Sequence, residues 1–194
     1  MPSARVKMIP LGATYRLQFH RGFTLRHAMD LVPYLSAPGV SHVYASPLLK
    51  ARSGSTHGYD VCDCSLLNPE LGTESDLDAL VAALRQRGMG LVLDLVPNHM
   101  GVGPENPWWW DVLTHGRASR FASYFDIDWD SPDACLQGKV LVPVLGHDYE
   151  LVLARGELKF ELEDGAPVLR YFEHRFPIAP GSRICFPHFP WPCW

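Results

Sequence analysis

The feature that most constrains this chain is an alternation of strand-like and helix-like segments over its first hundred residues. We expect strands at 13–19, 40–46 and 91–96, because these runs are rich in β-branched, aromatic and aliphatic residues. Helices are expected at 25–35 and 76–87, where apolar residues recur every three or four positions. The order strand–helix–strand–helix–strand is the beginning of a parallel α/β fold.

The third expected strand is apolar except for Asp94. Such a strand is typical of a parallel sheet with helices over both faces, so we expect it to be buried on both. No glycine-rich phosphate loop follows the first strand, at 18–22, which disfavours a dinucleotide-binding fold. After the second strand we expect a long polar loop, from about 48 to 73. Polar residues gather in this loop and after the third strand, where (β/α)₈ barrels carry their active sites. We therefore predict the amino-terminal part of a TIM barrel.

The second half of the chain has a different character. Strands are expected at 139–145, 157–163 and 168–172, and the turn at 163–165 predicts a β-hairpin. Three consecutive tryptophans, at 108–110, either pack this segment or help to exclude water from a site. The α/β alternation does not resume, so this segment is expected to be a β-rich inserted subdomain.

The predicted division of the chain is therefore 1–100 for about three β/α units of the barrel and 101–181 for the inserted subdomain. A complete (β/α)₈ barrel typically needs about 250 residues, so the barrel is expected to be incomplete and the chain alone to associate. Residues 182–194 contain three prolines, two tryptophans, two cysteines and no acidic residue. We interpret them as an aberrant tail from a frameshift or premature stop, with a genuine short tail as the alternative.

Composition excludes several classes of partner. Lys and Arg total 17 and Asp and Glu total 21, so the net charge of −4 argues against a nucleic-acid or anionic membrane surface. No apolar run is long enough to cross a bilayer. Five cysteines without metal-ligand spacing predict free thiols in a reducing cytoplasm.

Two clusters of polar residues are candidate binding groups. Asp94, Asn98 and His99 stand at the end of the third strand, where a buried carboxylate must be paired and a histidine can donate to a ligand hydroxyl. The alternative is that these side chains only hold the loop.

The second cluster consists of His57, Tyr59 and Asp60. A tyrosine offers a flat apolar face with a polar tip, which suits the C–H face and the hydroxyls of a sugar ring. A tight loop stabilised by its own hydrogen bonds remains the alternative.

These clusters together resemble the α-amylase superfamily, glycoside hydrolase family 13. Residues 94–99 (DLVPNH) are similar to its first conserved region, and 57–60 (HGYD) and 68–72 (NPELG) to the segment upstream. Three longer segments are similar to the maltooligosyltrehalose synthase family within it: 13–23 (ATYRLQFHRGF), 46–63 (SPLLKARSGSTHGYDVCD) and 170–181 (RYFEHRFPIAPG).

The resemblance implies an intramolecular transglucosylase that converts the reducing-end α-1,4 link of a maltooligosaccharide to the α,α-1,1 link of trehalose. It implies that His57 and His99 hydrogen-bond the reacting sugar, that Tyr59 stacks on it and that Asp60 binds its hydroxyls. Asp94 and Asn98 would shape the floor of the site.

In this superfamily the nucleophile and the acid/base follow the fourth and fifth barrel strands, so we expect no catalytic residue in this chain and no activity from it alone. We expect no cofactor and no metal, although calcium binding through Asn98 stays open.

The sequence leaves three alternative functions. A fragment of an α-glucan hydrolase or 4-α-glucanotransferase would share the superfamily motifs. A non-catalytic maltooligosaccharide-binding module could be built from Tyr59 and the tryptophans. A metal-dependent hydrolase is disfavoured because His57 and His99 lie on different loops without a known ligand spacing.

Overall fold

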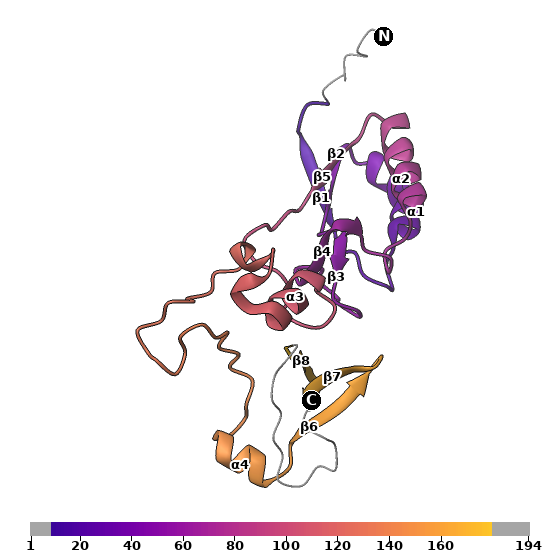
Figure 1. Ribbon diagram of the computed structural model, residues 1–194. Coiled ribbons are helices and arrows are strands. Elements are labelled where there is room, and N and C mark those ends of the chain that lie inside the picture. The colour runs from indigo at the N-terminus through magenta and orange to yellow at the C-terminus, as the bar shows by residue number, and fades with distance from the viewer. Residues whose placement is uncertain (1–8, 180–194) are drawn as a thin grey trace. The chain divides into compact units, whose positions relative to one another are not determined.

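The computed structural model describes residues 9–179 (Figure 1). The tail expected to be aberrant, 182–194, lies outside the described residues, as do the last two residues of segment 170–181. Two compact units succeed one another along the chain, and the first ends at Gly101.

The first unit is built on a parallel sheet of three strands in the order β1-β2-β5. These are β1 (Ala13–Leu17), β2 (Val40–Ala45) and β5 (Gly90–Leu93). Two helices, α1 (Leu25–Ser36) and α2 (Glu74–Gln86), pack against each other beside the sheet (Figure 1). The predicted order of strands and helices is confirmed, and the sheet of this unit is open.

The core of the first unit lies between the sheet and the two helices. Its members are aliphatic and aromatic side chains from β1, β2 and both helices, among them Leu17, Leu25, Val32, Val43 and Leu80. Helical periodicity predicts Leu25, Val32 and Leu80, because one face of each helix must pack on the sheet. Leu17 and Val43 come from β1 and β2.

Both helices begin at capping residues. Thr24 precedes α1, and the ring of His27 accepts its backbone N–H at 3.1 Å. Thr73 precedes α2 and exchanges hydrogen bonds with Asp76, whose Oδ2 accepts the backbone N–H of Thr73 at 2.9 Å. This capping box starts α2 at Glu74, two residues before the predicted start.

Two predictions for the first unit are wrong. The segment expected to be a long loop holds two antiparallel strands, β3 (Leu49–Ala51) and β4 (Val61–Leu67). Burial along β4 does not alternate, since its first two residues are both buried, so β4 lacks the period of two by which a strand is recognised in sequence. The prediction that the third strand is buried on both faces is also wrong, since Leu93 is 50% exposed and Leu95 is 63% exposed. β5 lies at an edge of the sheet, and the described residues of this unit add no further strand beside it.

The second unit begins with helical segments: α3 (Pro107–His115) and the 3₁₀ turns η1 (Gly116–Ala118) and η2 (Ala122–Tyr124). The three tryptophans lie on α3. Trp108 stacks on Phe121 with ring centroids 5.1 Å apart, so it packs this unit internally. A further helix, α4 (Tyr149–Ala154), precedes the sheet.

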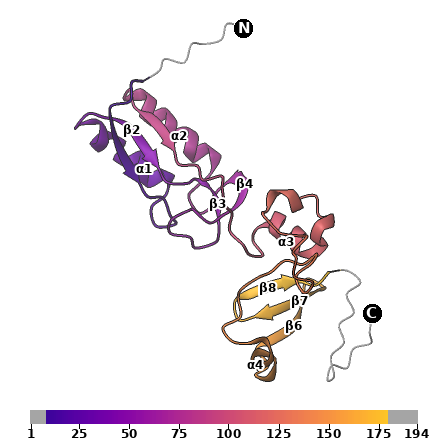
Figure 2. The same cartoon turned by 90° about the vertical axis from the view of Figure 1, so that its left-hand side faces the viewer.

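The sheet of the second unit is antiparallel, with strands β6 (Leu158–Glu163), β7 (Ala166–Tyr171) and β8 (His174–Pro177), as Figure 2 shows. The predicted hairpin is confirmed, and its turn has positive φ at Asp164 and Gly165, as a two-residue hairpin loop requires.

One prediction for this unit is wrong, and one strand was missed. The strand predicted at 139–145 does not form, and β8 was not predicted.

No helix among residues 9–179 is long and apolar enough to span a bilayer.

Candidate substrate-binding site

Polar side chains gather at the carboxyl ends of the three parallel strands. Asp94 follows β5 directly, and its backbone N–H donates to the carbonyl of Ala45 at 3.2 Å, which continues the sheet by one residue. Arg16 in β1 lies beside Tyr44 in β2 in the register of the sheet. Because parallel strands end at the same edge, residues up to 78 positions apart in sequence meet here.

The carboxylate of Asp94 is the centre of this site. Three donors converge on its Oδ2: the Tyr59 hydroxyl at 2.5 Å, the Tyr44 hydroxyl at 3.0 Å and Nη1 of Arg16 at 3.1 Å. Within residues 9–179, no donor reaches Oδ1. The site therefore holds a carboxylate with one oxygen fully used and the other available to a ligand.

These contacts set the charge of the group. The hydrogen bond from Tyr59 is the largest influence and lowers the pKa of Asp94; burial acts in the opposite direction, and the bonds from Tyr44 and Arg16 lower it further. The hydrogen bond to Asp94 raises the pKa of Tyr44. At neutral pH the site is an ionised carboxylate that accepts from protonated hydroxyls and a guanidinium.

Arg16 contacts several groups at once. Its Nη2 donates to the Tyr59 hydroxyl at 3.1 Å and to Oε1 of Gln18 at 3.2 Å. Its guanidinium carbon lies 4.8 Å from the centroid of the Tyr44 ring, a cation–π distance. Arg16 therefore fixes the Tyr59 hydroxyl and the Asp94 carboxylate relative to each other through its planar fork.

The loop that carries Tyr59 is tied to β1 and to itself. Nε2 of Gln18 donates to the carbonyl oxygens of Thr56 at 3.3 Å and His57 at 3.2 Å. The Tyr59 backbone N–H donates to Nδ1 of His57 at 3.0 Å, and the two rings stack with centroids 6.1 Å apart and planes 18° apart. Since Nδ1 of His57 accepts, a neutral ring carries its proton on Nε2, from which it can donate to a ligand.

Asp60 closes the same loop. Its Oδ1 accepts from the Ser55 hydroxyl at 2.5 Å, and that hydroxyl accepts the Gly58 backbone N–H at 3.1 Å. Oδ1 also lies 3.9 Å from Nδ1 of His57. Because that nitrogen already accepts from Tyr59, it has no proton to offer, and we do not count this approach as an ion pair.

Asn98 and His99 lie in the loop after β5. Nε2 of His99 donates to the Tyr59 carbonyl at 3.0 Å, and the Asn98 amide donates to Nδ1 of His99 at 3.3 Å. Both ring nitrogens of His99 are thus engaged within the protein, so direct contact with a sugar requires one of these bonds to be exchanged. The structure brings the six predicted site residues together, and their role in binding stays a prediction.

Three members of this site were missed in the sequence: Arg16, Gln18 and Tyr44. The spacing of Arg16 and Gln18 could have identified them, because polar residues two apart near the end of a strand share one face. Tyr44 is a polar-tipped residue one position before the end of β2.

Metal binding is not supported by the grouping of side chains in the described residues. Across residues 9–179, no three His, Cys, Asp or Glu side chains are grouped so that they could hold a metal ion. Calcium binding through Asn98 and the predicted absence of a metal both stay predictions.

Comparison with known proteins identifies the family. The family model described as Alpha amylase, catalytic domain, matches residues 24–147. A protein of Mycobacterium tuberculosis, named as a candidate maltooligosyl trehalose synthase, is 47% identical over 180 residues, which are 89% of this chain and 22% of that protein. An intracellular maltogenic amylase of Bacillus subtilis is 37% identical over 106 residues, or 55% of this chain and 17% of that protein.

The solved structures agree with the sequence relatives. The maltooligosyltrehalose synthase from Arthrobacter ramosus superposes with a TM-score of 0.79 and 46% sequence identity over 92% of this chain and 22% of that one. This chain therefore spans about a fifth of the length of the relatives it matches. The family match covers more than half of the sequence and the site carries the expected side chains: the chain belongs to the alpha-amylase family.

Proposed function

We propose that this chain is the amino-terminal part of the catalytic domain of a maltooligosyltrehalose synthase. Such an enzyme moves a glucosyl group within one maltooligosaccharide and turns the reducing-end α-1,4 link into the α,α-1,1 link of trehalose. The 46–47% identity to proteins of that name over about nine-tenths of this chain supports the assignment. The observation that carries it is the Tyr59 ring, fixed by its hydroxyl to Asp94 where the parallel strands end.

The six site residues would bind one glucose unit of the substrate. Tyr59 would stack on the apolar face of the ring, because sugar C–H groups pack well on aromatic faces. Nε2–H of His57 and Oδ1 of Asp94 would meet ring hydroxyls, one as donor and the other as acceptor. Asp60 would accept from a further hydroxyl, and Asn98 and His99 would hold the Tyr59 backbone or exchange one bond for the sugar.

The reacting carboxylates would come from protein outside this sequence. A retaining mechanism needs a nucleophile that forms the glycosyl-enzyme intermediate and a separate acid/base group. The resemblance places both after later barrel strands, so the 194 residues alone are expected to bind and not to react. In the whole enzyme the site must also exclude water, since the intermediate has to be captured by a sugar hydroxyl.

A chimera tests this proposal. Residues 9–179 would replace the equivalent segment of the Arthrobacter ramosus synthase, which is 46% identical. With maltopentaose as substrate, the chimera should remove reducing ends without releasing glucose. Tyr59→Ala in the chimera should abolish this loss, whereas Tyr15→Phe, a change of a half-exposed tyrosine of β1 outside the site, should not.

A second candidate function has one observation in its favour, the 37% identity to an intracellular maltogenic amylase. A hydrolase would raise the number of reducing ends, and a 4-α-glucanotransferase would keep it constant while chain lengths change. Either outcome in the chimera contradicts trehalose formation. Because the three activities lower, raise or preserve the number of reducing ends, a single assay separates them.

The proposed compartment and partners rest on the cysteines and on the net charge. Among residues 9–179, Cys64 and Cys135 are free thiols, which favours the cytoplasm as the site of action. An α-1,4-glucan is the proposed partner. No nucleic-acid or membrane partner is proposed, in keeping with the net charge of −4.

A further inference from the structure

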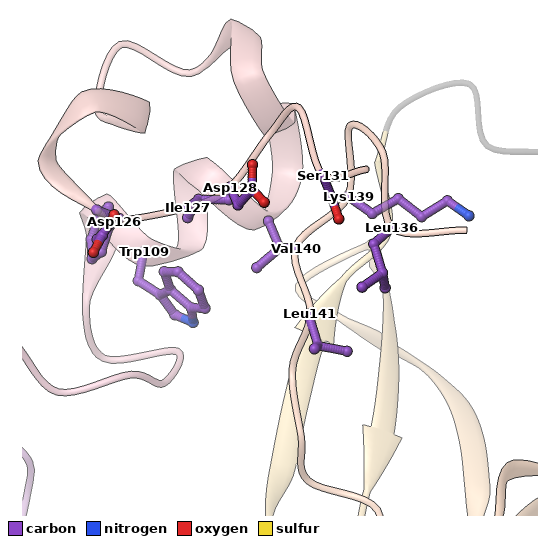
Figure 3. Close-up of a pocket in the computed structure, with 10 residues that line it drawn as sticks. Trp109, Asp126, Ile127, Asp128, Ser131, Leu136, Lys139, Val140 and Leu141 are labelled. Atoms are coloured by element: carbon purple, nitrogen blue, oxygen red, sulfur yellow. The ribbon is translucent and has the colours of Figure 1, made fainter. Parts of the chain in front are cut away.

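The second unit contains a cavity of about 340 Å³ that the first site does not use (Figure 3). This volume is within the range of small-molecule sites, about 300–1,000 Å³. Its walls come from α3 and from the segment 125–141. We propose that this cavity is a second carbohydrate site, which binds a glucose unit of an α-1,4-glucan apart from the Tyr59 site; the choice of sugar rests on the proposed function.

One wall of the cavity is the indole of Trp109. Its backbone is fixed at the start of α3, where Oδ1 of Asn106 accepts the N–H groups of Trp108 at 3.0 Å and Trp109 at 3.1 Å. The Trp109 ring packs against the Phe125 ring in a tilted arrangement, with centroids 5.2 Å apart and an interplanar angle of 56°. Trp108, by contrast, stacks on Phe121 inside the unit. Of these two neighbouring tryptophans, Trp109 is the one that lines the cavity.

The opposite wall is aliphatic. Figure 3 shows the Trp109 ring directed toward the side of the cavity formed by Val140 and Leu141. Leu141 is 68% exposed, so it marks the open side through which a ligand enters. A sugar ring that lies between the Trp109 indole and these two aliphatic side chains would bury its apolar face.

Polar groups surround these apolar walls. Asp126 and Asp128 line the cavity, and in the described part of the chain no group bonds to the Asp126 carboxylate. The only hydrogen bond that Asp128 accepts there comes from the Asp130 backbone at 3.2 Å, through Oδ1. Lys139 also lines the cavity but uses its ammonium on the carbonyl of Cys135 at 2.8 Å.

This combination selects the class of ligand. Asp126 and Asp128 are exposed and repel an anion, and their acceptor oxygens are available to the hydroxyl groups of a ligand. A neutral ring with one C–H face and several hydroxyls satisfies both the indole and the carboxylates. A glucose unit of the glucan proposed as substrate has this chemistry.

Tryptophan fluorescence of the full chain tests the proposal in dilute solution. Maltopentaose is added up to about 10 mM, about ten times a millimolar dissociation constant. We expect a saturable change that disappears in Trp109→Phe, because the signal arises from that indole. In Asp126→Asn the midpoint should rise about tenfold, as expected when a hydrogen bond to a charged group is weakened. Asp148→Asn, an exposed acid of the same unit that does not line the cavity, should leave the midpoint unchanged.

The outcomes separate this site from the first one. Tyr59→Ala should abolish binding at the first site and leave the Trp109 signal intact; loss of the signal in Tyr59→Ala would assign it to the first site and overturn the proposal. A signal that persists in Trp109→Phe, or an unchanged midpoint in Asp126→Asn, would overturn it as well. Cellopentaose should give no change, and an equal response to that β-1,4 glucan would contradict an α-1,4-glucan site.

Discussion

The hydroxyl of Tyr59 donates a hydrogen bond to Oδ2 of Asp94 across 2.5 Å. Tyr59 belongs to the loop between β3 and β4, and Asp94 follows β5, so this contact joins two segments that are 35 residues apart in sequence. The bond fixes the tilt of the aromatic ring and the charge of the carboxylate together. A change on either side is therefore expected to alter both the loop and the site.

Tyr59→Phe removes this hydrogen bond and keeps the ring. The free energy of unfolding should fall by about 1–2 kcal/mol, because the lost bond is made to a charged acceptor that is only 11% exposed. Urea unfolding measures the change. Tyr15→Phe is the matched control, since Tyr15 is 47% exposed on β1 and should change the unfolding free energy by less than about 0.5 kcal/mol. Equal effects in the two variants would mean that the Tyr59 hydroxyl contributes nothing specific.

Arg16→Lys tests whether the shape of the guanidinium matters as well as its charge. Arg16 reaches Asp94, Tyr59 and Gln18 at once, and a lysine has no planar fork for three partners. Its side chain is 36% exposed, so solvent screening limits the loss to about 0.5–1 kcal/mol. A double-mutant cycle with Tyr59→Phe should show non-additivity, because both side chains share one carboxylate. Strict additivity would indicate that Arg16 and Tyr59 act independently.

The first unit was largely predictable because its hydrophobic pattern and its fold agree. Leu25, Val32 and Leu80 lie in the core where helical periodicity places them, and Thr24 begins α1 as its sequence position suggests. The strands β3 and β4 were missed because glycine and polar residues dominate the surrounding loop. Their pairing is a tertiary contact that local sequence does not specify.

The site was predictable from its loops and not from its strands. His57, Tyr59 and Asp60 are recognisable as a short cluster within a polar loop, and Asp94 as the one charged residue of an apolar run. Arg16 was missed because a single charged residue within a strand is usually a solvent-facing one, and only the three-dimensional register brings it to Asp94. In the second unit, α3 was not predicted although Asn106 and Pro107 provide a helix start, because the three aromatic residues that follow have no strong helix preference.

Gly58→Ala should distort the loop that carries Tyr59. Gly58 has φ of +77°, and an added Cβ would lie 2.9 Å from the carbonyl oxygen of Pro47. Gly54 has φ of +73° and open space around it, so Gly54→Ala carries the backbone penalty, about 1–2 kcal/mol, without the clash. Thermal unfolding should show Gly58→Ala to be less stable than Gly54→Ala by at least about 1 kcal/mol. Equal melting temperatures would show that the loop moves freely from Pro47.

Acid should weaken the start of α2 through Asp76. The hydrogen bond from Arg26, followed by those from Thr73, lowers the pKa of Asp76 from 3.8 to about 2. A lowered pKa in the folded state means that the stabilisation is present above pH 3.8 and is lost as the pH falls toward 2. A carboxyl ¹³C titration should give the midpoint, and Asp76→Asn should remove this part of the pH dependence. Asp78→Asn, an exposed change on the same helix, should retain it; a midpoint near 3.8 for Asp76 would contradict the capping role.

The edge strand β5 should make the chain alone associate. Leu93 and Leu95 are 50% and 63% exposed, and in the described sheet β5 pairs with β2 on one side only, so its other side offers free backbone groups next to apolar side chains. Sedimentation velocity should show larger species as the protein concentration rises. Replacing both leucines by lysine should shift the distribution toward monomer, because charges on an edge strand oppose pairing. Tyr34→Lys, at a residue of α1 that is 68% exposed, should not have this effect. A monomeric chain with a sharp cooperative melt at all concentrations would show that this edge does not drive association.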